Sequence, residues 1–203
     1  MSKLTWLVVN DALKQSSSQN EVNLESHNIS TIDYDAFRGF KSIKKLYIGT
    51  NNLTQLSGSI FLALTNLEQI DLSKNQLETI NYNTFRGLSH LKEINLYDNK
   101  LTSIEQKAFY GLDKNLRTIN LSSNKLPSIH VELFKGLDNL EELDLSYNDI
   151  HEIGTQIFEG LTKLRTISLA YNELSIIEES LFKGKYFNII FFKILAKSNL
   201  EFI

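Results

Sequence analysis

A repeat of 24 residues runs through most of the chain and limits the folds that it can adopt. Seven copies begin at Gln19, Ile43, Leu67, Leu91, Leu116, Leu140 and Leu164. The one longer step, of 25 residues, separates Leu91 from Leu116, because Asp113-Lys114-Asn115 stands where the other copies have two residues. A fixed period of about 20 to 50 residues indicates a stacked array, in which each copy buries its apolar side against its neighbours.

Seven positions of the repeat, counted from those starts, hold nearly the same residue type in every copy. Positions 4, 6, 11 and 14 are apolar throughout, position 19 is phenylalanine in all seven copies, and position 21 is glycine in six, with Ala63 as the exception. Position 9 is His27 in the first copy and asparagine in the rest: Asn51, Asn75, Asn99, Asn124, Asn148 and Asn172. A helix would repeat apolar residues every 3.6 residues or so, which this pattern does not do.

The pattern resembles the leucine-rich-repeat family, whose signature is L-x-x-L-x-L-x-x-N-x-L. The stretch from Leu140 to Ile150 shows the signature without a gap, and the resemblance covers residues 19 to about 187. The 24-residue period with F-x-G-L is similar to the subtype of animal cell-surface and extracellular proteins, such as Toll-like receptor ectodomains, Slit-type guidance proteins and small proteoglycans. The resemblance implies an α/β horseshoe solenoid with a parallel sheet on its concave face and irregular or short helical convex segments.

Alternation of polar and apolar residues at positions 2 to 6 predicts a half-buried strand in each copy. Positions 4 and 6 then point inward, while positions 3 and 5 face solvent on an open concave wall. The position-9 asparagines are expected to form a structural ladder that satisfies backbone groups of the turn after each strand. The phenylalanines are expected to stack under the convex side, where neighbours could pack edge to face. The position-21 glycine should permit an unusual backbone angle.

Three segments follow from this register. Residues 1–18 form an N-terminal covering segment, in which Trp6-Leu7-Val8-Val9 is predicted as a short strand. Residues 19–187 hold the seven repeats. Residues 188–203 form a degenerate or truncated C-terminal repeat or cap, with Leu195, Ser198, Leu200 and Ile203 at positions 6, 9, 11 and 14.

A search for catalytic or metal-binding motifs finds none. There is no cysteine, the four histidines lack metal-ligand spacing, and no phosphate loop or nucleophile elbow is present. We therefore expect no enzyme activity, no cofactor and no metal site. The net charge of -3 argues against nucleic acid as a partner. No stretch approaches the ~20 apolar residues of a membrane span, so we expect no membrane insertion by this chain itself.

The concave wall is therefore the candidate binding surface, and we expect a protein partner. Exposed tyrosine offers a large contact area with a polar tip, which suits interfaces. The candidate partner-binding residues are Tyr47, Asp71, Glu93, Tyr97, Asp98, Glu142, Asp144, Tyr147 and Tyr171. The repeat subtype favours a receptor, adhesion or innate-sensing protein outside the cell or on its surface. The lack of cysteine and of a visible secretion signal favours the alternative, a cytoplasmic scaffold or regulatory subunit. A purely structural spacer is a third possibility.

Overall fold

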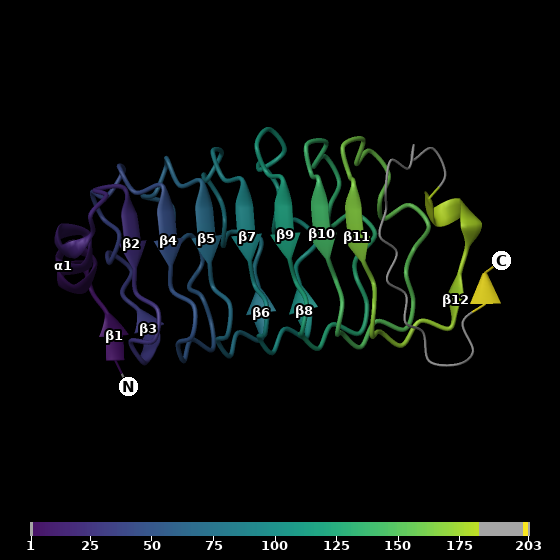
Figure 1. Cartoon of the computed structure of the whole chain (residues 1–203), viewed down its shortest axis with the longest axis horizontal. Coiled ribbons are helices and arrows are strands. Elements are labelled where there is room, and N and C mark those ends of the chain that lie inside the picture. The colour runs from purple at the N-terminus through teal and green to yellow at the C-terminus, as the bar shows by residue number, and fades with distance from the viewer. Residues whose placement is uncertain (1, 183–200, 203) are drawn as a thin grey trace.

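The computed structural model describes residues 2–182 and 201–202. The chain is a solenoid with few helices in its described part, and its repeats stack side by side along one long axis (Figure 1). One strand from each of the seven copies joins a parallel sheet on the concave face, in the order of the sequence. These strands are β2 (Glu21–Asn23), β4 (Lys45–Tyr47), β5 (Gln69–Asp71), β7 (Glu93–Asn95), β9 (Thr118–Asn120), β10 (Glu142–Asp144) and β11 (Thr166–Ser168).

Every strand of this sheet covers positions 3 to 5 of its copy, and the partners stay in register. Glu142 of β10, for example, lies opposite Thr118 on one side and Thr166 on the other. The position-4 side chains, such as Leu143, are buried, while the neighbours at positions 3 and 5 are exposed or half-buried. The alternation in the sequence therefore gives a sheet with one face in the core and one open to solvent.

In the described part of the chain, three further pairs of parallel strands lie outside this sheet. β1 (Ser2–Leu4) pairs with β3 (Ile29–Ile32), β6 (Thr79–Ile80) with β8 (Ser103–Ile104), and β12 (Ile176–Ile177) with β13 (Glu201–Phe202). A 3-10 helix, η1 (Glu179–Phe182), follows β12.

The position of β13 corrects the sequence register at the C-terminal end. Ile177, at position 14, lies opposite Phe202, so Phe202 rather than Ile203 corresponds to position 14. The step from Ile177 to Phe202 is 25 residues, the same as the longest step between copies elsewhere in the array. The predicted register, with Ile203 at position 14, needed a step that was one residue longer. The other residues assigned to an eighth repeat, Leu195, Ser198 and Leu200, lie outside the described residues.

The prediction of a strand at Trp6-Leu7-Val8-Val9 is wrong, because these residues begin helix α1 (Trp6–Gln15). Val9, Ala12 and Leu13 recur at helical spacing and pack against the core, with Val9 fully buried. The helix lies beyond β2 at one end of the array (Figure 1). The ring of Trp6 stacks on Phe40 at 5.5 Å between centroids, and its Nε1 donates to the carbonyl of Arg38 at 3.0 Å. A helix therefore covers the end of the first repeat.

Six of the position-19 phenylalanines are fully buried, but the ring pairs between neighbouring copies do not pack edge to face as expected. The rings of Phe109 and Phe134 are nearly parallel, with an interplanar angle of 9° and a centroid distance of 6.2 Å. Phe85 and Phe109 are similar, at 18° and 6.0 Å, and so are Phe158 and Phe182, at 16° and 6.2 Å, whereas Phe37 and Phe61 are tilted, at 43°. Successive repeats are close to simple translations of one another, so equivalent rings keep their orientation and stack with an offset.

The glycines at position 21 adopt left-handed backbone angles, with φ between 80° and 87° in the five described copies that have one. Ala63, which replaces this glycine, is not among the residues with positive φ; Ser59 of the same copy adopts φ 61° instead. The second copy therefore makes its convex turn differently, because a side chain at this position disfavours the left-handed angle.

We expect Gly111→Ala to lower the free energy of unfolding by roughly 1–2 kcal/mol, because φ is +86° there. A methyl group at this position would meet no atom within 4 Å, so backbone strain rather than a clash would cause the loss, and it outweighs the smaller gain from a less flexible unfolded chain. The control is Gly154→Ala, where the added carbon would make an ordinary 3.6 Å contact with Val131 and φ is not positive. Urea unfolding of both variants tests this, and equal midpoints would contradict it.

Candidate functional site

The turn that ends each strand is held by the position-9 asparagine. Asn75 Nδ2 donates to the carbonyls of Leu72 and of Ile48 in the preceding copy, at 3.1 and 3.0 Å. Its Oδ1 accepts the N–H of Leu53 at 3.0 Å. The same donor and acceptor pattern joins the other five asparagines to the copies before them: Asn51, Asn99, Asn124, Asn148 and Asn172. All six are buried, so the ladder fixes the edge of the concave wall without being available to a partner.

The residue before each ladder position adopts a left-handed backbone in all seven copies. The φ angles lie between 51° and 59° for Ser26, Thr50, Lys74, Asp98, Ser123, Tyr147 and Tyr171. This conformation lets the N–H reach the next copy; the N–H of Tyr147 donates to the carbonyl of Ala170 at 2.8 Å. A bulky residue is unfavourable at such an angle. The turn therefore does not explain why Tyr147 and Tyr171 occupy it.

Tyr147 and Tyr171 form a stacked pair at the edge of the wall. Their ring centroids are 4.2 Å apart and the planes differ by 14°. The side chains remain 52% and 44% exposed, so both rings offer apolar surface to solvent. The hydroxyl of Tyr171 raises the pKa of Tyr147 through a hydrogen bond, with smaller contributions from desolvation and from Tyr97. The structure thus brings two of the four candidate tyrosines together and places Tyr97 within electrostatic reach of them.

Tyr47 belongs to a separate part of the wall, four copies away from the pair. It is half-buried, and its hydroxyl donates to Oε1 of Gln69 at 3.3 Å. Burial raises its pKa, and the carboxylates of Glu21, Glu93 and Asp71 raise it further. The surroundings of Tyr47 on the wall are therefore acidic.

Asp71 and Asp144 have a structural role that sequence reasoning missed. Oδ1 of Asp144 accepts the N–H of Ser146 at 2.9 Å and its hydroxyl at 2.6 Å. Asp71 accepts the N–H of Ser73 at 2.8 Å and Nδ2 of Asn95 at 2.9 Å. The position-5 side chains that accept the position-7 N–H in this way in the other copies are Asn23, Asn95 and Asn120. The signal in the sequence was an Asp or Asn at position 5, which recurs in five of the seven copies.

The other acidic candidates keep their side chains open to solvent. Glu93 and Glu142 are exposed at position 3, and Asp98 is exposed at position 8. A charge change intended to test binding is therefore cleaner at Glu142 than at Asp144, because replacing Asp144 would also remove two hydrogen bonds from the turn.

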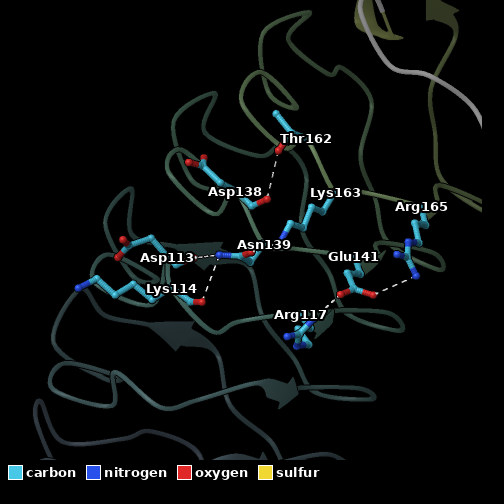
Figure 2. A network of polar contacts seen from close by, with 9 residues as sticks. All are labelled: Asp113, Lys114, Arg117, Asp138, Asn139, Glu141, Thr162, Lys163 and Arg165. Carbon is cyan, nitrogen blue, oxygen red and sulfur yellow. Dashed lines mark hydrogen bonds and ion pairs between the residues drawn. The ribbon is translucent and has the colours of Figure 1, made fainter.

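A row of ion pairs follows the rim where the strands begin, at position 2 of each copy. Glu68 lies between Lys44 and Lys92, at 3.0 and 2.5 Å, and Glu141 lies between Arg117 and Arg165, at 2.5 and 3.4 Å. Figure 2 shows the second group. We define these six residues as the rim row. Charges two copies apart thus share one carboxylate, which links three repeats.

The loop with the extra residue is fixed next to the rim row. Nδ2 of Asn139 donates to the carbonyls of Asp113 and Lys114, both at 3.1 Å, and Oδ1 of Asn139 accepts Nζ of Lys163 at 2.6 Å (Figure 2). The backbone of the loop with the inserted residue therefore has a defined place in the array.

We expect Glu68→Gln to destabilise the fold by about 1 kcal/mol near neutral pH and by much less in acid. Hydrogen bonds from Lys92 and Lys44 lower the pKa of Glu68 from 4.5 to about 2. A pKa that is lower in the folded state stabilises the fold above the unfolded pKa, and this contribution is lost as the pH falls from 4.5 toward 2.

Urea unfolding of both proteins at several pH values between about 7 and 3 measures this effect. The difference should also shrink in about 1 M salt, which screens exposed charges. A difference that stays the same at every pH would show that the glutamate acts through packing rather than through its charge.

The described residues hold no group of three or more histidine, cysteine, aspartate or glutamate side chains placed to bind a metal ion. Among the helices in the described part of the chain, none has the length and apolar character needed to span a membrane.

A parallel sheet with an asparagine ladder and a buried phenylalanine stack defines a leucine-rich-repeat protein. The family profile described as "Leucine rich repeat" matches overlapping stretches, at residues 18–77, 41–101, 65–114, 89–150, 114–174 and 143–184. The chain belongs to this family.

Two solved receptor structures are similar to the chain. TLR13, in its complex with ssRNA13, is 30% identical with a TM-score of 0.79, over 86% of this chain and 25% of that one. Toll from Drosophila, in its complex with Spatzle, is 22% identical with a TM-score of 0.75, over 80% of this chain and 22% of that one. The chain thus spans about a quarter or less of either receptor. No curated protein sequence matches it. Proteins of this family and receptors of this kind are typically non-enzymatic.

Proposed function

We propose that this chain is a non-enzymatic recognition module that binds a protein partner on its concave wall. The proposed role is that of a receptor, adhesion or innate-sensing protein, outside the cell or on its surface. The similarity to TLR13 and Toll supports this class. In this proposal residues 1–18 cover the first repeat and residues 19–187 form the recognition array, while most of residues 188–203, predicted as a degenerate or truncated repeat or cap, lie outside the described residues.

The observation that carries the proposal is the exposed, stacked pair Tyr147 and Tyr171. The left-handed turn recurs in every copy and disfavours bulky side chains, so the turn itself does not call for tyrosine at either position. Exposed apolar surface gathered in two adjacent copies is a reason to propose an interaction site. A flat aromatic surface next to the exposed carboxylates of the wall suits a partner with an apolar centre and basic surroundings.

We expect Tyr147→Ala and Tyr171→Ala each to weaken partner binding by more than about 1 kcal/mol, without loss of the fold. A partner is first isolated with the wild-type chain, and its dissociation constant is then measured with each purified variant. The matched control is Tyr110→Ala, a tyrosine that is 80% exposed and follows the core residue Phe109 on the convex side. If Tyr110→Ala weakens binding while the wall variants bind like wild type, the partner uses the convex side and the proposal is wrong.

Reversal of charge at Glu142 tests whether the carboxylates of the wall attract the partner. We expect Glu142→Lys mainly to slow association, because charges outside the buried centre act on encounter, and added salt should mask the difference. An unchanged association rate at low salt would show that the acidic wall does not steer this partner.

Single-stranded RNA is a second candidate ligand. The exclusion of nucleic acid by net charge is not supported, since the similar TLR13 structure is a complex with ssRNA. The carboxylates of the wall, which surround Tyr47, favour a protein over a polyanion. The binding assay therefore includes an RNA oligonucleotide, and affinity for it that depends on the wall tyrosines would select the second candidate. An intracellular scaffold remains the alternative role for a protein-binding wall.

A further inference from the structure

The rim row has a regular order of charges with one interruption. From the second copy to the seventh it reads Lys44, Glu68, Lys92, Arg117, Glu141 and Arg165. Each glutamate lies between two cations from adjacent copies and contacts both. Within this row, Lys92 and Arg117 are the one pair of neighbours with the same charge. Their backbones are directly adjacent, since the N–H of Arg117 donates to the carbonyl of Lys92 at 2.8 Å.

The two side chains of this pair have their ion-pair partners on opposite sides. Nζ of Lys92 contacts Glu68 at 2.5 Å in the preceding copy, and Nη1 of Arg117 contacts Glu141 at 2.5 Å in the following copy. The row therefore provides no carboxylate between them. Like charges on adjacent strands are destabilising, and the packing of the repeat does not require a charge at position 2, which is Asn20 in the first copy.

The rim row presents mainly positive charge to solvent. The side chains of Glu68 and Glu141 are 29% and 22% exposed, whereas those of the four cations are between 46% and 72% exposed. An ammonium has three N–H donors and a guanidinium has five. Each contact just described engages one nitrogen of the cation, so Lys92 and Arg117 keep capacity for another acceptor.

We propose that Lys92 and Arg117 form a recognition site for a carboxylate of the protein partner. This inference rests on the proposed function and adds a chemical requirement for the partner: an acidic side chain at the edge of its contact surface, against the rim row. The partner's carboxylate would bridge two cations from adjacent copies, as the carboxylates of Glu68 and Glu141 already do.

The surroundings favour a single carboxylate over a phosphate chain. Glu93 follows Lys92 directly and is exposed at position 3 of the wall, with Glu142 two copies farther along. A long polyanion that covers both the pair and the wall would meet these carboxylates, whereas a single acidic side chain, or a short acidic peptide that lies along the rim, would not.

The test uses a capped tetraglutamate peptide as the probe and follows the Lys92 and Arg117 signals by NMR titration at low salt. We expect saturable shifts at both residues for the wild-type chain, and binding at least about fivefold weaker for Lys92→Ala and for Arg117→Ala. Arg117→Lys should restore part of the affinity, because it keeps the charge. The matched control is Lys125→Ala, which removes an exposed cation outside the rim row and should bind like wild type.

Three outcomes would overturn the proposal. They are no shift at Lys92 and Arg117, equal weakening by Lys125→Ala, and binding of a short RNA oligonucleotide at this pair when tetraglutamate does not bind. The two proposals are tested separately, because the wall variants are scored on binding of the partner and the rim variants on binding of tetraglutamate. If the wall variants bind the partner normally but the rim variants lose tetraglutamate, only the concave-wall proposal fails.

Discussion

Phe109→Ala is expected to lower the free energy of unfolding by about 3–5 kcal/mol, the largest effect among the single changes considered. The side chain is 1% exposed and stacks between Phe85 at 6.0 Å and Phe134 at 6.2 Å. Its removal leaves a cavity between repeats and ends two ring contacts. In an array where each copy contacts only its neighbours, no distant packing can compensate for the loss.

Chemical denaturation followed by circular dichroism measures this effect. The control is Tyr110→Ala, the next residue along the chain, which is 80% exposed and should change stability by less than about 0.5 kcal/mol. A Phe109→Ala protein with a wild-type midpoint would mean that the phenylalanine stack does not hold the convex side together.

Asn99→Ala is expected to cost about 1–3 kcal/mol through unpaired backbone groups. Nδ2 of Asn99 donates to the carbonyls of Leu72 and Leu96 at 3.0 and 3.1 Å, and Oδ1 accepts the N–H of Leu77 at 3.1 Å. The site is buried, and alanine supplies neither a donor nor an acceptor. The leucine N–H and both carbonyls would then lose a partner that water cannot easily replace.

The control for the ladder is Asn52→Ala. Asn52 lies in an equivalent turn one position beyond the ladder and is exposed. Its replacement should change the free energy of unfolding by less than about 0.5 kcal/mol. Equal effects of the two changes would show that the ladder bonds add nothing beyond what a surface turn provides.

The sheet could be predicted from the sequence because the repeat specifies it seven times over. The period fixes which residues lie opposite one another, and the alternation at positions 3 to 5 fixes which face is buried. Helix α1 was missed because it lies before the first copy, where no repeat supports an assignment. There the apolar run from Trp6 to Val9 suits a strand as well as the first turn of a helix, and only Ala12 and Leu13 favour the helix.

The candidate site was predicted less completely than the fold. Sequence position identifies the wall residues, and the stacking of Tyr147 on Tyr171 follows from their equal positions in adjacent copies. The hydrogen bonds of Asp71 and Asp144 were missed because an exposed acid at a solvent-facing position looks available for binding. The rim row was missed for a different reason. Its glutamates and cations are 24 residues apart or more, so they become neighbours only when the copies are aligned on position 2.

Carboxyl footprinting of the complex with the isolated protein partner tests the central claim most directly. The claim is that the concave wall, and not the convex side, contacts the partner. Binding should reduce the labelling of the exposed wall residues Glu93, Asp98 and Glu142, while the exposed convex residue Glu159 should be labelled as in the free chain. Protection of Glu159 with unchanged labelling of the three wall residues would contradict the account.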